Sequence, residues 1–308
     1  MGKISTFING LLCVALVGGI CYEGFSIYSS FSRIPNSNVT SISIGESNVN
    51  NEISQTEETT TDGSVLFRNI QVENKVDLYS GNLVNVTIDN YSDYYSKNLE
   101  LSNIYENRNE YYAVNSIDDE ISSNVIGELN SMLSDFGQAT DNTDSMIKLA
   151  YIYPDDLTDI LKCDHITGLS FNLSSYDGNT IEDFNGSGDF SWIMDRADKY
   201  GFIQRYPSDK VQYTGIDEPS HFRYVGLPHS SYMKENNLCL EEYIATVKLY
   251  TYDNPLEITT FNGRTYDVYY VSAYFDDSYT NIPIPMDKEY SISGDNVEGY
   301  IVTVKVSG

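Results

Sequence analysis

Two short stretches, CDHITGLSFNL (Cys163–Leu173) and DEPSHFRYVG (Asp217–Gly226), decide how this chain folds and what chemistry it could carry. Together they hold two of the only three histidines in 308 residues. Within the first stretch, GLSFNL is short and largely apolar, which predicts a buried strand. In the second, Glu218 precedes His221 by three residues, a spacing at which the carboxylate can take a proton beside a metal that the histidine binds. The bare spacing is a weak signal, because both histidines could equally be satisfied core residues.

The segments around these stretches predict helices and further strands. Apolar residues at helical spacing run from Ile121 to Phe136 and predict a helix with Gly137 just past its end. Two more helices are expected from about Ser191 to Tyr200, stopped by Gly201, and from about Ser231 to Tyr250. Predicted strands elsewhere cover Asn82–Ile88, Ile147–Tyr153, Leu256–Phe261, Tyr266–Ala273, Tyr290–Ile292 and Tyr300–Val306.

Composition excludes one class of partner and favours strands. Hydrophobic residues make up 41% of the chain, so most of it should fold. With 45 acidic and 18 basic residues, the net charge of −27 would repel a nucleic-acid backbone, and no nucleic-acid partner is expected. Tyrosine outnumbers phenylalanine by 27 to 12, a bias typical of half-buried sheet surfaces.

The N-terminal residues predict a membrane anchor. Ile4–Tyr22 is a run of 19 residues without a charge, which is about the length of a transmembrane helix. Lys3 precedes the run, and a net charge of −28 follows it, so we expect residues 1–28 to be a cytoplasmic tip and a single span, with the body on the extracytoplasmic side of a Gram-positive-type cell membrane. A cleaved signal peptide is the alternative, although no small-residue cleavage pattern follows the run. A lipoprotein reading through Cys21 is weaker, because Ile20 stands where a small residue is expected.

Beyond the predicted anchor the chain divides into three more parts. Residues 29–64 are mostly rich in Ser, Thr, Asn and Glu and predict a disordered stalk. A folded body is expected over 65–250, followed by a β-rich extension over 251–308. In this body and extension, Cys163 and Cys239 could form a disulfide, but free buried thiols are an equally good expectation.

Four motifs in order resemble the zinc D-alanyl-D-alanine carboxypeptidases of the VanY type, which belong with the lysostaphin-like and hedgehog-like metallopeptidases. They are HITGLSFN from His165, the segment Trp192–Gly215, EPSHFRYVG from Glu218, and LEEYI from Leu240. With flanking runs, the resemblance spans roughly Phe67 to Val306. It implies an α+β fold with a small antiparallel sheet and flanking helices, one zinc ion, and a substrate that is a peptidoglycan stem peptide ending in D-Ala-D-Ala.

The resemblance also implies the roles of individual residues. His165 and His221 match the two histidine ligands of the zinc, and Glu218 matches the catalytic base. The family's aspartate ligand falls on Asn172, whose neutral amide is a weaker zinc ligand than a carboxylate. Other residues remain open as a substitute ligand, namely Asp164, Asp177 and His229.

Further departures concern the substrate side. The family carries a Tyr-Arg pair whose arginine grips the substrate's terminal carboxylate; here Tyr151 remains in the substrate-binding position, and Ile152 replaces the arginine. Ser220 stands where the family has a tryptophan, and Cys163 where it has a serine. Arginines elsewhere are expected as structural ion-pair partners, namely Arg196, Arg205 and Arg223.

These residues lead to two functional hypotheses. The first is a membrane-anchored, extracytoplasmic carboxypeptidase homologue that acts on or binds stem peptides, with catalysis impaired at Asn172 and Ile152. The alternative is a non-catalytic module that binds the cell wall or serves as a structural partner. Whether the chain turns over substrate is left open by the sequence.

Overall fold

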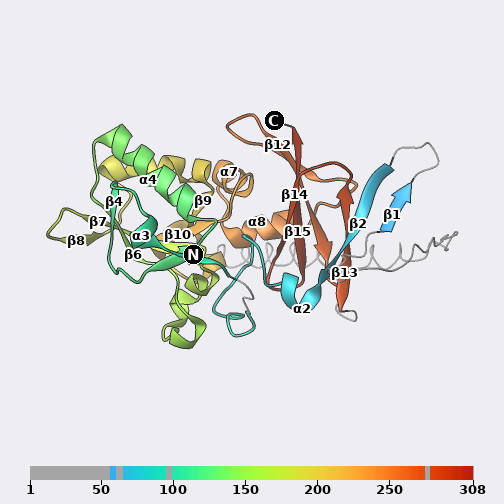
Figure 1. Ribbon diagram of the computed structural model, residues 1–308, viewed down its shortest axis with the longest axis horizontal. Helices are drawn as coiled ribbons and strands as arrows, with labels where there is room; N and C mark the ends of the chain where they lie inside the picture. The colour runs from blue at the N-terminus through green and yellow to red at the C-terminus, as the bar shows by residue number, and fades with distance from the viewer. Residues whose placement is uncertain (1–55, 60–64, 95–98, 275–277, 308) are drawn as a thin grey trace, which may run out of the picture. The chain divides into compact units, whose positions relative to one another are not determined.

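The structure is a computed structural model that describes residues 56–59, 65–94, 99–274 and 278–307 (Figure 1). These residues belong to the compact unit Glu52–Gly308. The predicted anchor at 1–28 lies outside the described residues, as does the predicted stalk at 29–64 except for strand β1 (Thr56–Thr59). Within the described ranges, no helix combines the length and the apolar character needed to cross a bilayer.

A six-stranded sheet carries both decisive stretches. Its strand order is β4-β6-β7-β10-β9, with β8 paired to β7, and all neighbours are antiparallel except β4 and β6. The strands are β4 (Tyr112–Val114), β6 (Ser145–Leu149), β7 (Ser170–Tyr176), β8 (Ile181–Asp183), β9 (Phe202–Tyr206) and β10 (Glu218–Tyr224). A separate two-stranded ribbon pairs β3 (Leu101–Asn103) with β5 (Glu120–Ser122). The strand predicted within the first stretch is therefore confirmed as β7.

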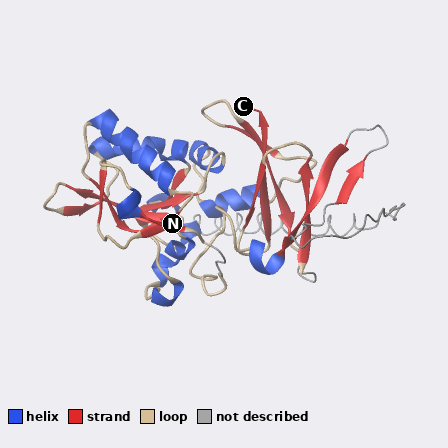
Figure 2. Ribbon diagram, viewed as in Figure 1, coloured by secondary structure: helices blue, strands red, loops and turns tan. Residues whose placement is uncertain are grey.

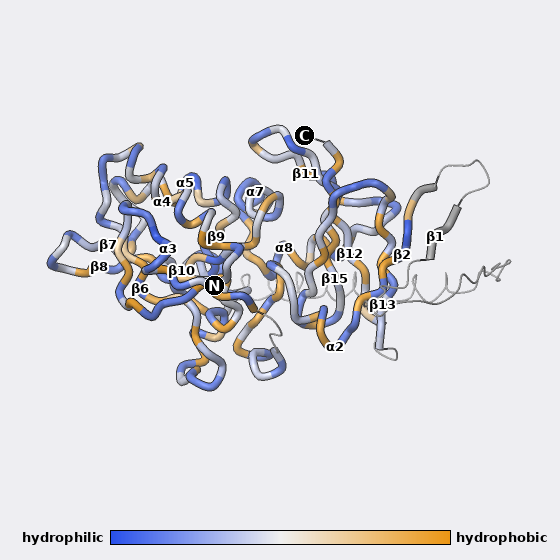
Figure 3. Tube along the Cα trace, viewed as in Figure 1, coloured by the Kyte–Doolittle hydropathy of each residue, from blue (hydrophilic) through white to orange (hydrophobic). Residues whose placement is uncertain are grey.

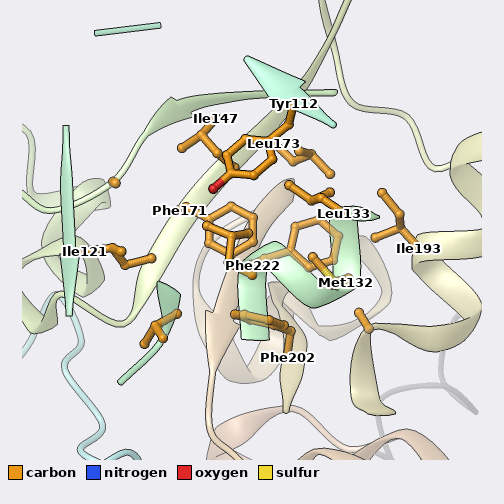
Figure 4. Packing of buried hydrophobic residues seen from close by; sticks show 14 of the residues in the cluster. Tyr112, Ile121, Met132, Leu133, Ile147, Phe171, Leu173, Ile193, Phe202 and Phe222 are labelled. Atoms are coloured by element: carbon orange, nitrogen blue, oxygen red, sulfur yellow. The ribbon is translucent and has the colours of Figure 1, made fainter. Parts of the chain in front are cut away.

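Helix α4 (Ile126–Thr140) covers one face of this sheet. Its apolar side packs Leu129, Met132, Leu133 and Phe136 against strand residues that include Phe171 and Phe222 (Figure 4). The other helices are short: α2 (Asn74–Asp77), α3 (Ile104–Asn107), α5 (Ser191–Arg196), α6 (Val211–Thr214), α7 (His229–Glu235) and α8 (Leu240–Val247). Single turns of 3₁₀ helix are η1 (Pro154–Asp156), η3 (Gly188–Phe190), η4 (Ala197–Tyr200) and η5 (Ser208–Lys210), and η2 (Ile160–Thr167) is longer. The fold is mixed α+β, as expected.

The C-terminal residues contribute strands to two further sheets, one of which also contains β1 and β2. One has the order β11-β12-β15-β14, and the other has the order β1-β2-β13. Their strands are β2 (Val65–Glu73), β11 (Leu256–Thr259), β12 (Thr265–Ser272), β13 (Tyr279–Pro285), β14 (Tyr290–Gly294) and β15 (Gly299–Ser307). After α8 the described chain contains only strands and loops (Figure 2).

The two C-terminal sheets share a hydrophobic core, and α8 packs on the four-stranded one. Ile70, Ile282 and Val302 lie in the core between the sheets, whereas Tyr243 of α8 packs against residues such as Val268 and Ile301. Strands β12, β13 and β15 accordingly carry hydrophobic stretches, while the loops are mostly hydrophilic (Figure 3). Because β2 pairs with β13, residues at the start of the predicted 65–250 body belong to the same sheet as the C-terminal extension.

Several predicted elements were wrong in detail. Residues 82–88 form an irregular segment with turns at its ends rather than a strand, because Leu83, Val84 and Val86 enter three different hydrophobic clusters and cannot share one pleated face. The helix predicted from about Ser231 to Tyr250 is split into α7 and α8. The split lies at Asn237, where φ is +50°, and Cys239 then caps α8 together with Glu242.

The long helix also differs from its prediction at both ends. Residues Glu120–Ser122 form β5, so the helix begins only at Ile126. Gly137 lies inside α4 rather than past its end. A glycine is needed there because the ring of Tyr111 packs where a side chain at this position would stand. The missing side chain therefore serves packing, not helix termination.

Candidate active site

The two decisive stretches meet on the sheet face opposite α4. On β7, Phe171 and Leu173 point into the core, so Asn172 between them points to the other face. On β10, His221 is the direct partner of Asn172, and its neighbour Phe222 points into the core. The alternation of side chains along two paired strands thus places these two polar residues next to each other.

His165 and Glu218 complete this cluster. His165 lies in η2, which ends at Gly168 in a left-handed conformation before β7 begins. Its ring centroid is 4.4 Å from that of His221, and both histidines are fully buried. Glu218, three residues before His221 on β10, has its Oε2 atom 3.8 Å from His221 Nδ1. The structure therefore brings His165, Asn172, His221 and Glu218 together.

Asn172 interacts directly with the residue predicted to be the base. Its Nδ2 atom donates a hydrogen bond of 2.5 Å to Glu218 Oε1 and a longer one of 3.4 Å to Ser220 Oγ. The proximity of His221, and after it that of Asn172, holds the pKa of Glu218 below its ordinary value despite burial. Glu218 is therefore ionised near neutral pH, which is the form that a general base requires.

A buried acid, Asp164, orients His221 from behind. Its Oδ2 atom lies 3.2 Å from His221 Nε2 and also accepts a hydrogen bond from Ser170. Its Oδ1 atom accepts from Arg223 and lies 3.7 Å from Arg205 Nε. Burial by itself would raise the pKa of Asp164, but Arg223, His221 and Arg205 hold it well below the usual range of an aspartate.

The contacts of Arg205 and Arg223 bear on two predictions, their own role as ion-pair partners and the choice of Asp164 as a substitute metal ligand. Arg205 makes a two-pronged ion pair with Glu241, at 2.6 and 3.0 Å, and Arg223 pairs with Asp164, so both are structural partners as predicted. Asp164 is not a substitute metal ligand, because its two oxygens are already bonded to these groups. Asp177 lies in an exposed turn and His229 bonds to Tyr243 and Thr303, so neither joins the cluster.

Within this cluster, the polar atoms left without partners indicate where a metal ion could bind. These buried atoms are both ring nitrogens of His165, Nδ1 of His221 and Oδ1 of Asn172. Burial and the neighbouring His221 lower the pKa of His165 to about 3, so its ring is neutral, as a metal ligand must be. Among the described residues no three His, Cys, Asp or Glu side chains form a metal-binding group, because the third position here is an amide. The donors that this cluster offers to a metal ion are therefore two imidazoles and one amide oxygen.

A cavity of about 560 Å³ opens beside the cluster. Asn172, Glu218 and Ser220 line it, which places the predicted Ser220 at the cavity wall. Tyr151 is not among the lining residues, and its ring packs edge-on against Tyr153 with centroids 4.8 Å apart. Cys163 and Cys239 are free thiols, and burial raises the pKa of each to about 12.

Two lysines that the sequence reasoning did not select also line this cavity. Lys148 extends from β6 and Lys162 from η2. The sequence carried a signal for Lys148, which is the one charged residue in the apolar run IKLAYIY. A lysine in a predicted buried strand must place its ammonium group in solvent or in a polar cavity.

Comparison with known proteins agrees with this geometry. The VanY family profile, described as D-alanyl-D-alanine carboxypeptidase, matches residues 162–227, which contain both histidines, Asn172 and Glu218. A D-alanyl-D-alanine carboxypeptidase of Enterococcus faecium is 41% identical over 142 residues, covering 46% of this chain and 43% of the relative. The bifunctional D-Ala-D-Ala dipeptidase and D-Ala-D-Ala carboxypeptidase VanXYC of Enterococcus gallinarum is 51% identical over 61 residues, covering 20% of this chain and 32% of the relative.

The matched regions span less than half the length of these curated relatives. The fold likeness extends further along this chain. The crystal structure of the vancomycin-resistance D,D-dipeptidase VanXYg, in complex with a D-Ala-D-Ala phosphinate analogue, has a TM-score of 0.67 and 28% identity, covering 78% of this chain and 100% of that one. In its motifs, in the family profile over residues 162–227 and in this shared fold, the chain is similar to the VanY D-alanyl-D-alanine carboxypeptidase family.

Proposed function

We propose that the chain binds peptidoglycan stem peptides ending in D-Ala-D-Ala and, with a zinc ion bound, hydrolyses them slowly. One observation carries this proposal. His165, His221 and Glu218 lie together beside a cavity, with Asn172 in the place of the third ligand.

The chain's own groups supply the acid-base part of a hydrolysis. Glu218 is ionised and faces the cavity, so it can take a proton from an attacking water and return it to the leaving amine. Asp164 holds His221 by Nε2 and leaves Nδ1 facing Glu218. A zinc ion bound by His165, His221 and the amide oxygen of Asn172 would supply a Lewis acid for the scissile carbonyl.

Two substitutions support slow rather than efficient turnover. An amide oxygen carries no charge, so Asn172 would bind zinc more weakly than the family's aspartate does. Ile152 cannot replace an arginine that supports a developing oxyanion, and losing one such group typically costs about 10²–10³ in rate.

The place of action is part of the same proposal. An uncharged run at Ile4–Tyr22 would anchor the chain in the cell membrane with its acidic body outside, where the stem peptides of the cell wall are. Fusing a reporter enzyme that works only outside the cytoplasm to the C-terminus tests this orientation. An active reporter is expected, and an inactive one in an intact fusion would contradict it.

The activity is tested on the purified full chain. Zinc per chain, binding of a pentapeptide ending in D-Ala-D-Ala, and D-alanine release from it are measured for the wild type, Glu218→Ala and the double variant Asn172→Asp with Ile152→Arg. Slow release that Glu218→Ala abolishes, and that the double variant increases, is the expected result. If the wild type binds the pentapeptide but no variant releases D-alanine, the chain is a non-catalytic wall-binding module. If the wild type neither binds nor cleaves it, the stem-peptide proposal is wrong.

A further inference from the structure

Lys148 occupies an irregular position in the sheet next to the candidate active site. Along β6 and β7, Ile147 pairs with Leu173 and Leu149 pairs with Asn172, so Lys148 is the extra residue of a β-bulge. Bulges change the direction of a side chain and occur often next to active sites. Here the bulge belongs to the strand adjacent to Asn172.

The bulge presents Lys148 to the cavity rather than to the core. Ile147 belongs to the core beneath α4, whereas Lys148 is exposed and lines the same cavity as Asn172, Glu218 and Ser220. Neighbouring strands lie about 4.8 Å apart, a distance that a lysine side chain exceeds, so its ammonium group can reach a ligand lying over Asn172.

The charge of the cavity makes this lysine chemically significant. Three acidic residues line the cavity, namely Asp183, Asp217 and Glu218, and the whole chain carries a charge of −27. A peptide carboxylate entering this cavity therefore needs a positive group to offset the repulsion. The cations lining the cavity are Lys148 and Lys162.

We propose that Lys148 binds the terminal carboxylate of the peptide substrate, and so takes the role of the arginine that is replaced by Ile152. This inference rests on the proposed function, since it assigns a residue to the same cavity. Ile152 does not line the cavity, whereas Lys148 does.

Lys148 is better placed for this role than Lys162. It belongs to β6, the strand paired with β7 beside Asn172, whereas Lys162 lies on η2, outside the sheet. Lys162 therefore provides a matched control, because removing it takes the same charge from the same cavity.

Asp183 of β8 is the counter-ion of Lys148 when no peptide is bound. The Nζ atom of Lys148 lies 3.2 Å from Asp183 Oδ1, and the Asp183 side chain is 89% exposed. An exposed pair of this kind is weak, so a second carboxylate can share or displace it. Neutralising Asp183 should therefore strengthen peptide binding.

The test compares two peptides that differ only at the C-terminus. N-acetyl-D-Ala-D-Ala as the free acid and as the C-terminal amide are titrated into the full chain by calorimetry, using the wild type, Lys148→Met, Lys148→Arg, Lys162→Met and Asp183→Asn. We expect the wild type to prefer the acid by about tenfold, as a charge-assisted hydrogen bond predicts. Lys148→Met should lose this preference, Lys148→Arg and Lys162→Met should keep it, and Asp183→Asn should increase it.

The outcomes separate this inference from the proposed function. If the wild type prefers the acid and Lys148→Met keeps that preference, the assignment of Lys148 is wrong while stem-peptide binding stands. If the wild type binds acid and amide equally, the cavity does not recognise the terminal carboxylate of the peptide, and the assignment of Lys148 is also wrong. If the wild type binds neither peptide, both proposals fall. Thermal unfolding of each variant shows whether a lost preference reflects a lost fold.

Discussion

Asn172 is the residue that would limit zinc binding at this site. Its amide oxygen is buried without a partner, and its nitrogen bonds to Glu218. Replacing it by aspartate restores a charged ligand, so Asn172→Asp should raise zinc affinity by at least about tenfold. Competition with a chelator of known affinity measures this in the full chain.

The same substitution has a cost when no metal is present. An aspartate at this position would place a second carboxylate against Glu218, so the metal-free variant should unfold more easily than the wild type, and zinc should reverse the difference. Asn172→Ser removes the amide without adding charge and is the control. A metal-free Asn172→Asp variant as stable as the wild type would contradict the contact between these side chains.

Asp164 is the residue whose loss should damage the fold most directly. Removing its charge leaves Arg223 buried without an ionic partner and places a neutral amide against His221 Nε2. Breaking a buried pair in this way costs about 3–5 kcal/mol, so Asp164→Asn should lower the free energy of unfolding by that order. Chemical denaturation measures it.

A milder change in the same network provides the comparison. Ser170 donates to Asp164, and Ser170→Ala removes one hydrogen bond but no charge. It should cost about 1 kcal/mol. Equal effects of the two variants would show that Arg223 finds another partner.

The sequence predicted the residue types of the site better than their surroundings. The positions of His165, His221 and Glu218 follow from motif spacing, and pairing of β7 with β10 brings them together. The role of Asp164 could not be read from the sequence, because it depends on Arg205 and Arg223, which approach from two other strands. Tyr151 was selected by motif position alone, and its contact with Tyr153 could not be foreseen.

At the scale of elements, α4 offers a test of why its two glycines are present. A side chain at Gly137 would collide with the ring of Tyr111, whereas nothing lies within 4 Å of the corresponding position at Gly127. Alanine normally stabilises a helix by roughly 0.5–1 kcal/mol relative to glycine. Gly127→Ala should therefore raise the free energy of unfolding slightly, and Gly137→Ala should lower it by about 1–3 kcal/mol.

The control for this pair removes the obstacle rather than the glycine. In the background Tyr111→Ala, the further change Gly137→Ala should no longer destabilise the protein. Persisting destabilisation would mean that another neighbour of Gly137 is responsible. Urea denaturation of the wild type, the two single variants and the double variant measures the coupling between Gly137 and Tyr111.

Elements were predictable where one face of a helix or strand meets one core. The apolar side of α4 enters a single cluster, and its helical spacing was visible in the sequence. Residues 82–88 looked like a strand because apolar and polar residues alternate, but they connect three clusters. Strand β13 was missed because Pro283 and Pro285 interrupt its sequence pattern, although it pairs with β2 along its length.

At the scale of the whole molecule, His229 joins parts that are distant in sequence. From α7 it bonds to Tyr243 Oη of α8 at 2.6 Å and to Thr303 Oγ1 of β15 at 3.1 Å. Burial lowers its pKa from 6.5 to about 3, so the folded chain holds it neutral. No charged group bonds to this ring among the residues that the structure describes, and protonation would place an unpaired charge in the core.

This arrangement predicts a loss of stability at acidic pH. The unfolded chain binds a proton at His229 below about pH 6.5, whereas the folded chain does so only near pH 3. Between these values the unfolded state holds more protons, so the free energy of unfolding should fall as the pH falls, with this residue contributing up to about 1.4 kcal/mol per pH unit. The glutamine of His229→Gln cannot be protonated in this range, so the free energy of unfolding should change less steeply with pH in this variant than in the wild type between pH 6 and pH 4, as measured by denaturant titrations.

His165 also has a lowered pKa and remains in both proteins, so the difference between the two slopes isolates His229. Identical slopes would contradict a neutral, buried His229 as a source of acid sensitivity.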